Sequence, residues 1–394
     1  MKPMRLLNIS LSTPMAHKPD ARGPNDPQLH QIAYSRFFEK MIYVIKTPDS
    51  PEYEPFDLTD KIRIVPSRSA SRWAFLKHAA ALGARAIREH GVNIIAAQEP
   101  FGTGAAGLLL ARRFGLPLCV HNVNDAIDNP QWLAEEPVNR IMNPLGKFVL
   151  RRAGAVRVDS VSEAEKMARI GVPPARVHNI QFIVNEADSF TSADGSEIRK
   201  QILVEPFTQF VLFVGRFEPQ KDFETLFAVV REVASHKPRV RFVVAGSGKR
   251  EAEYRALAEK TGAAQNILFT GWVDYFDLPK YYAGADAFLL CSVHETNPRV
   301  VIFSRLAQKA AVSTDVSGVR DFIEDGVSGF VRPLKDAPGL AQALMRILDD
   351  PERAAAMGRA GFETAQRILD RGHILAQMES MYRGIFEERF GKGR

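Results

Sequence analysis

The chain has 394 residues, which is long for one ordinary domain and leads us to expect two to three domains. Hydrophobic residues make up 45% of it and charged residues 25%, a composition that excludes collagen-like, low-complexity and disordered proteins. The formal net charge of +6 suits acidic ligands or an anionic membrane surface, and it equally suits an ordinary, mildly basic soluble enzyme.

The first half alternates short apolar runs with helical patterns, which predicts parallel strands joined by crossover helices. The predicted strands are 5–11, 41–45, 62–65, 92–97, 116–120 and 155–161, and the clearest helices are 73–90 and 104–114. Residues 12–30 interrupt this rhythm with four prolines. They predict a long irregular loop after the first strand, of the kind that is either functional or disordered.

A second series begins near residue 208, after a polar segment, 186–207, that we interpret as an irregular linker. Its predicted strands are 210–214, 240–245, 267–270, 287–290, 312–314 and 329–331, and its helices include 223–234, 251–261 and 299–309. The last ~40 residues read as helical, within the usual length of one or two helices. The sequence therefore predicts an α/β protein with two doubly wound, Rossmann-like domains facing a cleft.

Two cysteines, Cys119 and Cys291, lie in apolar strand-like runs, which favours reduced thiols and a reducing compartment. No window reaches the ~18 uninterrupted apolar residues of a membrane span, and the nearest, 105–120, is interrupted by Arg112 and Arg113. We therefore expect a cytoplasmic protein. Peripheral contact with the inner membrane face remains open, because 140–152 mixes basic and apolar residues, although such a helix more often packs on its own sheet.

The segment Gly215-Arg216-Phe217-Glu218-Pro219-Gln220-Lys221-Asp222 follows a predicted strand and opens a predicted helix. Open α/β sheets bind ligands at this position, and a helix N-terminus offers N–H groups and positive potential to an anion. Arg216 adds a planar fork and Lys221 a point charge, so both can point at one diphosphate. The same spacing also fits two surface charges that flank a turn.

A second candidate segment, 290–298, follows another predicted strand and precedes the helix 299–309. Thr296 or Asn297 is expected to cap this helix, with Pro298 in its first turn. Glu295 would then stand beside a second helix N-terminus at the same sheet edge, where it could accept hydrogen bonds from sugar hydroxyls. Its simpler interpretation is a charge that satisfies the helix dipole.

From 210 to 333 the sequence resembles the C-terminal domain of the retaining GT-B glycosyltransferases of family 4. The matching pieces, in chain order, are Gly215-Arg216-Phe217 with Lys221, Ala245-Gly246-Ser247-Gly248, Gly271-Trp272-Val273, Tyr281-Tyr282 to Ala285-Asp286, Ser292 to Glu295, Thr314 to Asp321 and Glu324 to Phe330. The first half resembles the family more weakly, through Val120-His121-Asn122 and Val161-Ser162-Glu163.

This resemblance implies a metal-independent sugar transfer from a nucleotide-sugar, which is a substrate, so that no cofactor or metal site is expected. Arg216 and Lys221 would neutralise the diphosphate leaving group, Glu295 would contact the donor sugar, and His121 would be an active-site histidine. A strand-end histidine with a purely structural role is the alternative for His121. The remaining donor-binding residues implied by the family are Gly215, Gly246, Gly248, Val273, Thr296, Asn297 and Pro298.

The resemblance also implies a division of labour. Residues 1–190 would form the acceptor-side domain and residues 191–370 the nucleotide-sugar domain, with 371–394 forming a helix that crosses back to the first. The acceptor would be a glycan or a lipid-linked molecule, in polysaccharide or glycoconjugate biosynthesis. The sugar, the base and the acceptor are not specified by the sequence.

One position departs from the family pattern. The family has two glutamates separated by seven residues, but the second, counted from Glu295, is replaced by Phe303, which cannot accept hydrogen bonds from ribose hydroxyls. Neighbouring Arg305 could substitute for contacts to the nucleotide, although it offers only donors. Either the donor is held in another way, or the protein is a weakened or inactive relative that acts by binding.

Other functional classes are less favoured. The segment Gly102-Thr103-Gly104-Ala105-Ala106-Gly107 fits a dinucleotide fingerprint, but that motif normally follows the first strand, so a tight turn with close helix packing is the plainer interpretation. No metal-ligand spacing, hydrolase nucleophile elbow or nucleic-acid module occurs in the sequence. A GT-B nucleotide-sugar epimerase remains an alternative, but it would need further acid/base groups.

Overall fold

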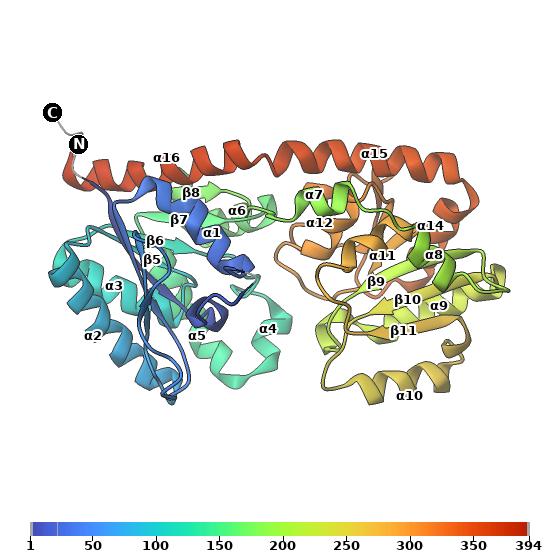
Figure 1. Ribbon diagram of the computed structural model, residues 1–394, viewed down its shortest axis with the longest axis horizontal. Helices are drawn as coiled ribbons and strands as arrows, with labels where there is room; N and C mark the ends of the chain where they lie inside the picture. Colours follow the sequence, from blue (N-terminus) through green and yellow to red (C-terminus); the bar gives the residue numbers. More distant parts are fainter. Residues whose placement is uncertain (1–2, 22, 392–394) are drawn as a thin grey trace. The chain divides into compact units, whose positions relative to one another are not determined.

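The computed structural model describes residues 3–21 and 23–391, so residues 392–394 of the predicted closing helix lie outside the described part (Figure 1). The chain divides into two compact units. The first comprises Met1–Asn185 and Asp370–Arg394, and the second comprises Glu186–Leu369. Across the described residues, none of the helices is both long enough and apolar enough to span a bilayer.

The first unit is built on an eight-stranded sheet in which only β3 runs antiparallel to its neighbour. Its order is β3-β4-β2-β1-β5-β6-β7-β8, with β1 (Arg5–Ser10), β2 (Lys40–Ile45), β3 (Phe56–Asp57), β4 (Ile62–Pro66), β5 (Ile94–Ala97), β6 (Leu118–His121), β7 (Ala155–Val158) and β8 (Val177–Asn179). Successive strand residues enter different cores, as the period of two requires, so both faces of the sheet are covered.

Helices cover both faces of this sheet. They are α1 (Asp26–Tyr34), α2 (Arg72–His90), α3 (Gly102–Phe114), α4 (Pro130–Glu135), α5 (Pro137–Leu150), α6 (Val161–Arg169) and α16 (Arg371–Phe390). The last helix, α16, buries Ile374, Met378 and Met381 in the same core as the strand residues Met41 and Cys119, so the C-terminal segment belongs to the first unit.

The second unit has a six-stranded, wholly parallel sheet of order β11-β10-β9-β12-β13-β14. The strands are β9 (Gln209–Val214), β10 (Val240–Ala245), β11 (Ile267–Gly271), β12 (Ala287–Leu290), β13 (Ala311–Thr314) and β14 (Gly329–Arg332). The helices are α7 (Ala187–Thr191), α8 (Ser196–Ile202), α9 (Phe223–His236), α10 (Glu251–Thr261), α11 (Leu278–Gly284), α12 (Arg299–Leu306), α13 (Val319–Phe322), α14 (Ala337–Asp349) and α15 (Pro351–Ile368).

This strand order is the doubly wound order 3-2-1-4-5-6, in which the direction of winding reverses between β9 and β12. Once its short antiparallel strand β3 is left out, the first sheet shows this order with one further strand, β8, added after β7. The predicted α/β class with two Rossmann-like domains is therefore confirmed. In such sheets the crevice for ligands opens at the carboxyl ends of the strands where the winding reverses.

Two segments that we predicted as irregular contain helices. Within 12–30, α1 begins at Asp26 because Asn25 and Gln28 form a reciprocal capping box, and Pro27 lies in the first turn, where a proline costs no hydrogen bond. Within 186–207, α7 and α8 occupy most of the segment, and Phe190 of α7 is only 1% exposed. A polar linker is therefore the wrong description of this segment.

The glycines of residues 102–107 lie inside helix α3, which begins at Gly102, and not in a turn that precedes it. A Cβ atom at Gly104 would lie 2.8 Å from the Glu99 carbonyl oxygen, and one at Gly107 would lie 3.0 Å from Leu118. These glycines therefore allow α3 to approach the sheet closely, which agrees with the packing interpretation of the motif.

Candidate functional site

The candidate site lies in the second unit, where the loops after β9 and β12 diverge from neighbouring strands. The two loops are joined by two hydrogen bonds: the Val293 N–H donates to the Gln220 carbonyl at 2.9 Å, and Gln220 Nε2 donates to the His294 carbonyl at 2.8 Å. Both predicted segments therefore meet at the point where doubly wound sheets bind ligands.

Close backbone packing joins the loop after β10 to the same site. Gly246 has a φ of +146°, and a Cβ atom there would lie 2.0 Å from the Gly215 carbonyl oxygen. A Cβ atom at Gly248 would lie 2.8 Å from the Phe217 nitrogen, next to the hydrogen bond from Phe217 N–H to the Ser247 carbonyl. Only glycine fits at these two positions, so the predicted donor-site glycines shape the loop that lines the site.

An ion pair stands at the centre of the site. Lys221 Nζ lies 2.5 Å from Glu295 Oε1, and Ser292 Oγ donates to the same oxygen at 2.8 Å. Ser292 is held in turn by Thr314, whose Oγ1 donates to its carbonyl at 2.6 Å. The Lys221 and Glu295 side chains are only 12% and 13% exposed, so their attraction is less screened by solvent than that of a surface pair.

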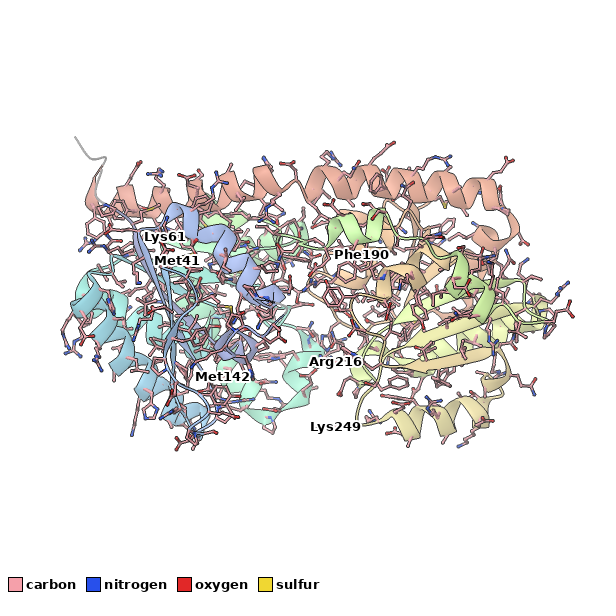
Figure 2. The ribbon with its side chains drawn as sticks, in the orientation of Figure 1. Met41, Lys61, Met142, Phe190, Arg216 and Lys249 are labelled. Atoms are coloured by element: carbon pink, nitrogen blue, oxygen red, sulfur yellow. The ribbon has the colours of Figure 1, made fainter. Side chains whose placement is uncertain are left out.

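Arg216 presents a free cation beside this pair. Its side chain is exposed, and its guanidinium makes no hydrogen bond or ion pair with any residue in 3–21 or 23–391. Figure 2 shows Arg216 and Lys249 on the loops after β9 and β10, at the carboxyl edge of the second sheet. All five N–H donors of Arg216 are therefore available to an anion.

A pocket of about 290 Å³ brings these groups together. Of the predicted residues, its lining includes Gly215, Arg216, Lys221, Gly246, Val273 and Glu295. It also includes Gln220, Ala245, Ser247 and Trp272, which lie in the quoted segments but were not predicted as donor-binding residues. The lining residues that the sequence did not single out are Val214, Tyr275, Leu278 and Val300. A volume of this size is at the lower end for small-molecule sites.

The predicted residues Thr296, Asn297 and Pro298 do not line this pocket but lead from it into α12. The expected cap is wrong: the N-cap residue of α12 is Pro298 itself, and no side chain caps this helix. The segment is fixed instead by Gly318, where a Cβ atom would lie 2.5 Å from the Thr296 carbonyl oxygen. The N-terminal end of α12 favours an anion through the helix dipole.

Phe303 does not line the pocket, because its ring is packed into an aromatic cluster behind the pocket wall. It is 4% exposed, it stacks on Phe190 with ring centroids 4.3 Å apart, and it meets the edges of Tyr275 and Tyr282. Tyr275 stands between this cluster and the pocket, and its hydroxyl receives a hydrogen bond from Arg299 Nη2 at 3.2 Å. Tyr275 is therefore a polar side chain of the pocket wall that also contacts Phe303.

Arg305 is not the nucleotide contact that we considered. Its side chain is fully buried, and Nη1 and Nη2 donate to the carbonyls of Ser328 and Lys309. Burial lowers the pKa of Arg305 to about 9. The guanidinium lies against Gly361 of α15, so its role is to join helix α12 to α15.

His121 lies in the first unit, at the end of β6, and both of its ring nitrogens have partners there. Nε2 lies 2.8 Å from the Tyr382 hydroxyl of α16, and Nδ1 lies 3.4 Å from Arg157 Nη1. Burial, with a smaller effect of Arg157, lowers the pKa of His121 to about 3, so the ring is neutral. A contact between His121 and a sugar stays a prediction, and it would require the Tyr382 hydrogen bond to open.

Glu163, after β7, is also buried in the first unit. It pairs with Lys166 at 2.5 Å and accepts a hydrogen bond from Asn122 Nδ2 at 3.1 Å. Burial raises its pKa from 4.5 to about 7. It contributes stability below pH 4.5 that is lost as the pH rises through 7, whereas His121 contributes stability above pH 6.5 that is lost as the pH falls toward 3.

These opposite signs give a titration prediction for the first unit. Relative to the wild type, His121→Gln should gain up to about 1.4 kcal/mol of stability per pH unit as the pH falls from 6.5 to 4.5. Glu163→Gln should gain stability in the opposite direction, as the pH rises from 4.5 to 7. Urea unfolding, monitored by hydrogen exchange of the β6 amides, measures the stability of both variants relative to the wild type. Stability differences that do not vary with pH would contradict these assignments.

Comparison with known proteins agrees with this geometry. The family described as "Glycosyl transferases group 1" matches residues 194–364, and the "Glycosyl transferase 4-like domain" matches residues 44–181. Alpha-D-kanosaminyltransferase from Streptomyces kanamyceticus is 27% identical over 77% of this chain and 79% of its own length. A D-inositol 3-phosphate glycosyltransferase from Segniliparus rotundus is 31% identical over 67% of this chain and 60% of its own length.

Solved structures show the same fold. Sucrose-phosphate synthase from Thermosynechococcus elongatus has a TM-score of 0.80 and 21% identity, over 98% of this chain and 100% of that one. Anabaena HepE, solved in complex with UDP-glucose, has a TM-score of 0.73 and 18% identity, over 97% and 100% of the two chains. The fold is therefore GT-B, as predicted. Residues 44–181 therefore form a glycosyltransferase 4-like domain, and residues 194–364 form a domain of the glycosyltransferases of group 1.

Proposed function

We propose that the protein transfers a sugar from a nucleoside-diphosphate-sugar to a glycan or lipid-linked acceptor, with retention of anomeric configuration and without a metal ion. The observation that carries this proposal is the Lys221–Glu295 pair beside the unpaired Arg216 in one pocket at the winding reversal. The named relatives are sugar transferases, and HepE was solved with UDP-glucose, which supports this donor class. These relatives do not favour the epimerase or the inactive alternative.

The chemistry requires charge stabilisation at the leaving group. As the bond from the sugar to the diphosphate breaks, negative charge grows on the phosphate oxygens. Arg216 can chelate two of them with its fork, and Lys221 adds a point charge that Glu295 and the loop hydrogen bonds hold in place. Because these cations are positioned before the reaction, stabilisation of the transition state costs little reorganisation.

Glu295 is proposed to face the sugar while one oxygen stays on Lys221. That oxygen, Oε1, already accepts from Lys221 and Ser292, so Oε2 is the atom that would accept a sugar hydroxyl. Gly215, Gly246 and Val273 would form the backbone wall of the donor pocket, and Gly248 would support it by its close packing on Phe217. The segment Thr296-Asn297-Pro298 would place the N-terminus of α12 beside the phosphate. We keep His121 as the proposed catalytic residue of the first unit.

A replacement of Glu295 separates transfer from nucleotide binding. Glu295→Ala should lower kcat/KM for transfer by roughly a hundredfold or more, because the sugar contact is lost. Affinity for UDP or GDP should be unchanged or higher, because Lys221 keeps its charge and loses a competing carboxylate. Steady-state kinetics and calorimetry measure the two effects, and a variant with wild-type transfer would remove Glu295 from the site.

We also propose peripheral contact with the cytoplasmic membrane face through helix α5. Met142 and Leu145 of this helix pack against the first core, as the packing alternative expected, while Ile141 and Phe148 are 68% and 40% exposed. Arg140 and Arg151 on the same helix region suit anionic headgroups. Lipid-linked acceptors would make such contact useful.

A further inference from the structure

A hollow of about 590 Å³ lies on the first unit at the amino ends of its strands, away from the carboxyl ends that line sites in doubly wound folds. Its walls come from the end of α3, the starts of β6 and β7, and the last turns of α16. The lining includes Arg112, Arg152, Arg176 and Arg389, and the one carboxylate among its lining residues is Glu388.

Three of these arginines are held in place by carbonyl oxygens. Arg389 Nε donates to Gly115 at 2.6 Å, Arg152 Nη1 donates to Phe148 at 3.3 Å, and Arg176 Nη1 donates to Ala153 at 3.5 Å. These oxygens lie at or just after the ends of α3 and α5, where the helix dipole favours cations. Each contact uses one of the five N–H donors of a guanidinium group, so most donors of each of these arginines remain available to a ligand.

The hollow lacks matching negative charge. In the part of the chain that the structure describes, none of the four arginines forms an ion pair, and Arg112 makes no hydrogen bond. The guanidiniums of Arg152 and Arg112 lie over the Phe148 ring, 3.7 and 5.8 Å from its centroid, which keeps them near each other. Several like charges around one hollow repel each other until an anion enters.

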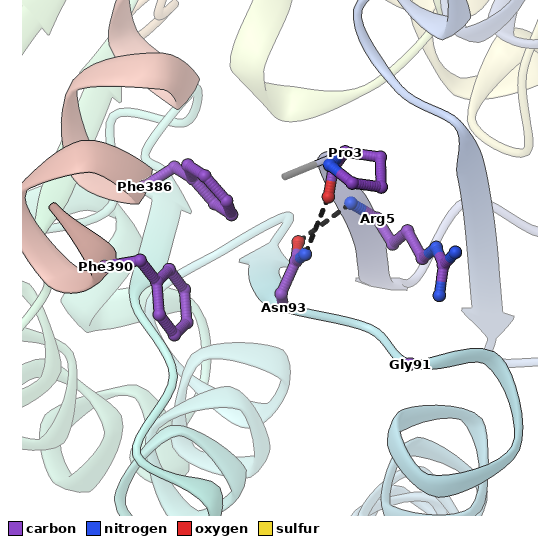
Figure 3. Close-up of a pocket in the computed structure, with 6 residues that line it drawn as sticks. All are labelled: Pro3, Arg5, Gly91, Asn93, Phe386 and Phe390. Carbon is purple, nitrogen blue, oxygen red and sulfur yellow. Dashed lines mark hydrogen bonds between the residues drawn. The ribbon is translucent and has the colours of Figure 1, made fainter. Parts of the chain in front are cut away.

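A second hollow, of about 320 Å³, offers a contrast (Figure 3). It is also lined by residues of α16, and Arg5 is the cation among its lining residues. That guanidinium is already committed: Nη2 pairs with Glu39 at 2.8 Å, and Nη1 donates to the His90 carbonyl at 3.5 Å. Guanidinium groups without an ion-pair partner are therefore a feature of the first hollow and not of this one. We call the first hollow, lined by Arg112, Arg152, Arg176 and Arg389, the arginine hollow.

We propose that the arginine hollow binds a phosphate-bearing ligand, with the forks of Arg112 and Arg152 as its main contacts. Planar guanidinium groups match phosphate oxygens in bidentate geometry, and clusters of them are typical of phosphate recognition. The phosphate can come from a soluble compound or from a lipid headgroup, for which the exposed Leu109 and Phe148 nearby provide apolar contact. This site lies in the first unit and does not depend on the donor pocket of the second.

The test uses the full chain with Arg216→Ala and Lys221→Ala, so that the donor pocket does not bind the probe. Binding of inorganic pyrophosphate is measured by calorimetry, and binding to phosphatidylcholine vesicles with and without phosphatidylglycerol is measured by co-sedimentation. Adding Arg112→Gln and Arg152→Gln should weaken binding of one probe by at least about tenfold, because each substitution removes charge-assisted hydrogen bonds to the phosphate.

The matched control is Arg88→Gln with Arg113→Gln, which removes the same charge from two exposed arginines of the first unit that do not line the hollow. Selective loss of pyrophosphate binding identifies a soluble ligand, and selective loss of phosphatidylglycerol binding identifies a lipid headgroup. The proposal is overturned if neither probe binds, or if the control pair weakens binding as much as the hollow pair. If the double variant does not fold, Arg112→Gln alone decides, because that side chain makes no hydrogen bond with the described residues.

Discussion

Replacing Lys221 by alanine is expected to weaken UDP or GDP binding by on the order of a hundredfold and to reduce sugar transfer below detection. The lost charge-assisted contact with the diphosphate accounts for ~1.5–3 kcal/mol. A second effect adds to it, because the variant leaves Glu295, only 13% exposed, without its 2.5 Å partner. The unpaired carboxylate would then repel the diphosphate that enters the pocket.

Lys249→Ala is the matched control for this prediction. Lys249 is an exposed cation on the loop after β10, directly after Gly248, but it does not line the pocket. Both variants lose one positive charge, so a general effect of net charge would appear in both. Calorimetric titration should find near-normal affinity for Lys249→Ala, and an unchanged affinity for Lys221→Ala would remove the diphosphate assignment.

How well the sequence predicted this site depends on which contacts are local. Strands β10 and β12 were located to the residue, because buried parallel strands read as nearly continuous apolar runs; only Arg241 interrupts the run in β10. The short strands β3 and β8 were missed, because they are edge strands with no fully buried residue and leave no such run.

The ion pair itself could not be read from the sequence. Lys221 and Glu295 were each predicted for the site, but they are 74 residues apart, and only the pairing of β9 with β12 brings their loops together. The same holds for Trp272, which lies in the matched Gly271-Trp272-Val273 segment, and for Tyr275, which follows it; both enter the pocket wall only through the loop after β11. Local pattern gives the residue types at a sheet edge, and the strand order decides which of them touch.

The aromatic cluster around Phe303 shows even more clearly that local sequence patterns do not predict long-range contacts. We interpreted 186–207 as a linker because it is polar, yet Phe190 from this segment stacks on Phe303 of α12. The Phe303 substitution looked like the loss of a ribose contact when only the family pattern was considered. In the structure it belongs to the packing that fixes α7 and α11 to α12.

This packing leads to the second large prediction, that restoring the family's glutamate will not restore a nucleotide contact. Phe303→Glu is expected to destabilise the second unit by roughly 3–5 kcal/mol, because it removes a ring that is 4% exposed and buries a carboxylate among aromatic groups. Stacked rings of this kind contribute ~0.5–1.5 kcal/mol beyond the area that they bury. Nucleotide affinity, measured where the variant is folded, should not rise.

Two further variants make the result decisive. Phe303→Leu keeps an apolar side chain and should cost about 1.5 kcal/mol or less, so a large difference from Phe303→Glu isolates the buried charge. Tyr282→Phe changes a neighbouring ring of the cluster without adding charge, and it reports how well the cluster tolerates a lost hydroxyl that donates to Val300 at 3.0 Å. Arg299, whose guanidinium lies 5.5 Å from the Phe303 ring centroid, is a nearby cation that such a carboxylate would have to recruit from Tyr275 and Glu186. If Phe303→Glu instead remains as stable as the wild type and binds UDP or GDP about tenfold more tightly, the ring has merely replaced a ligand contact, and the packing role assigned to Phe303 is wrong.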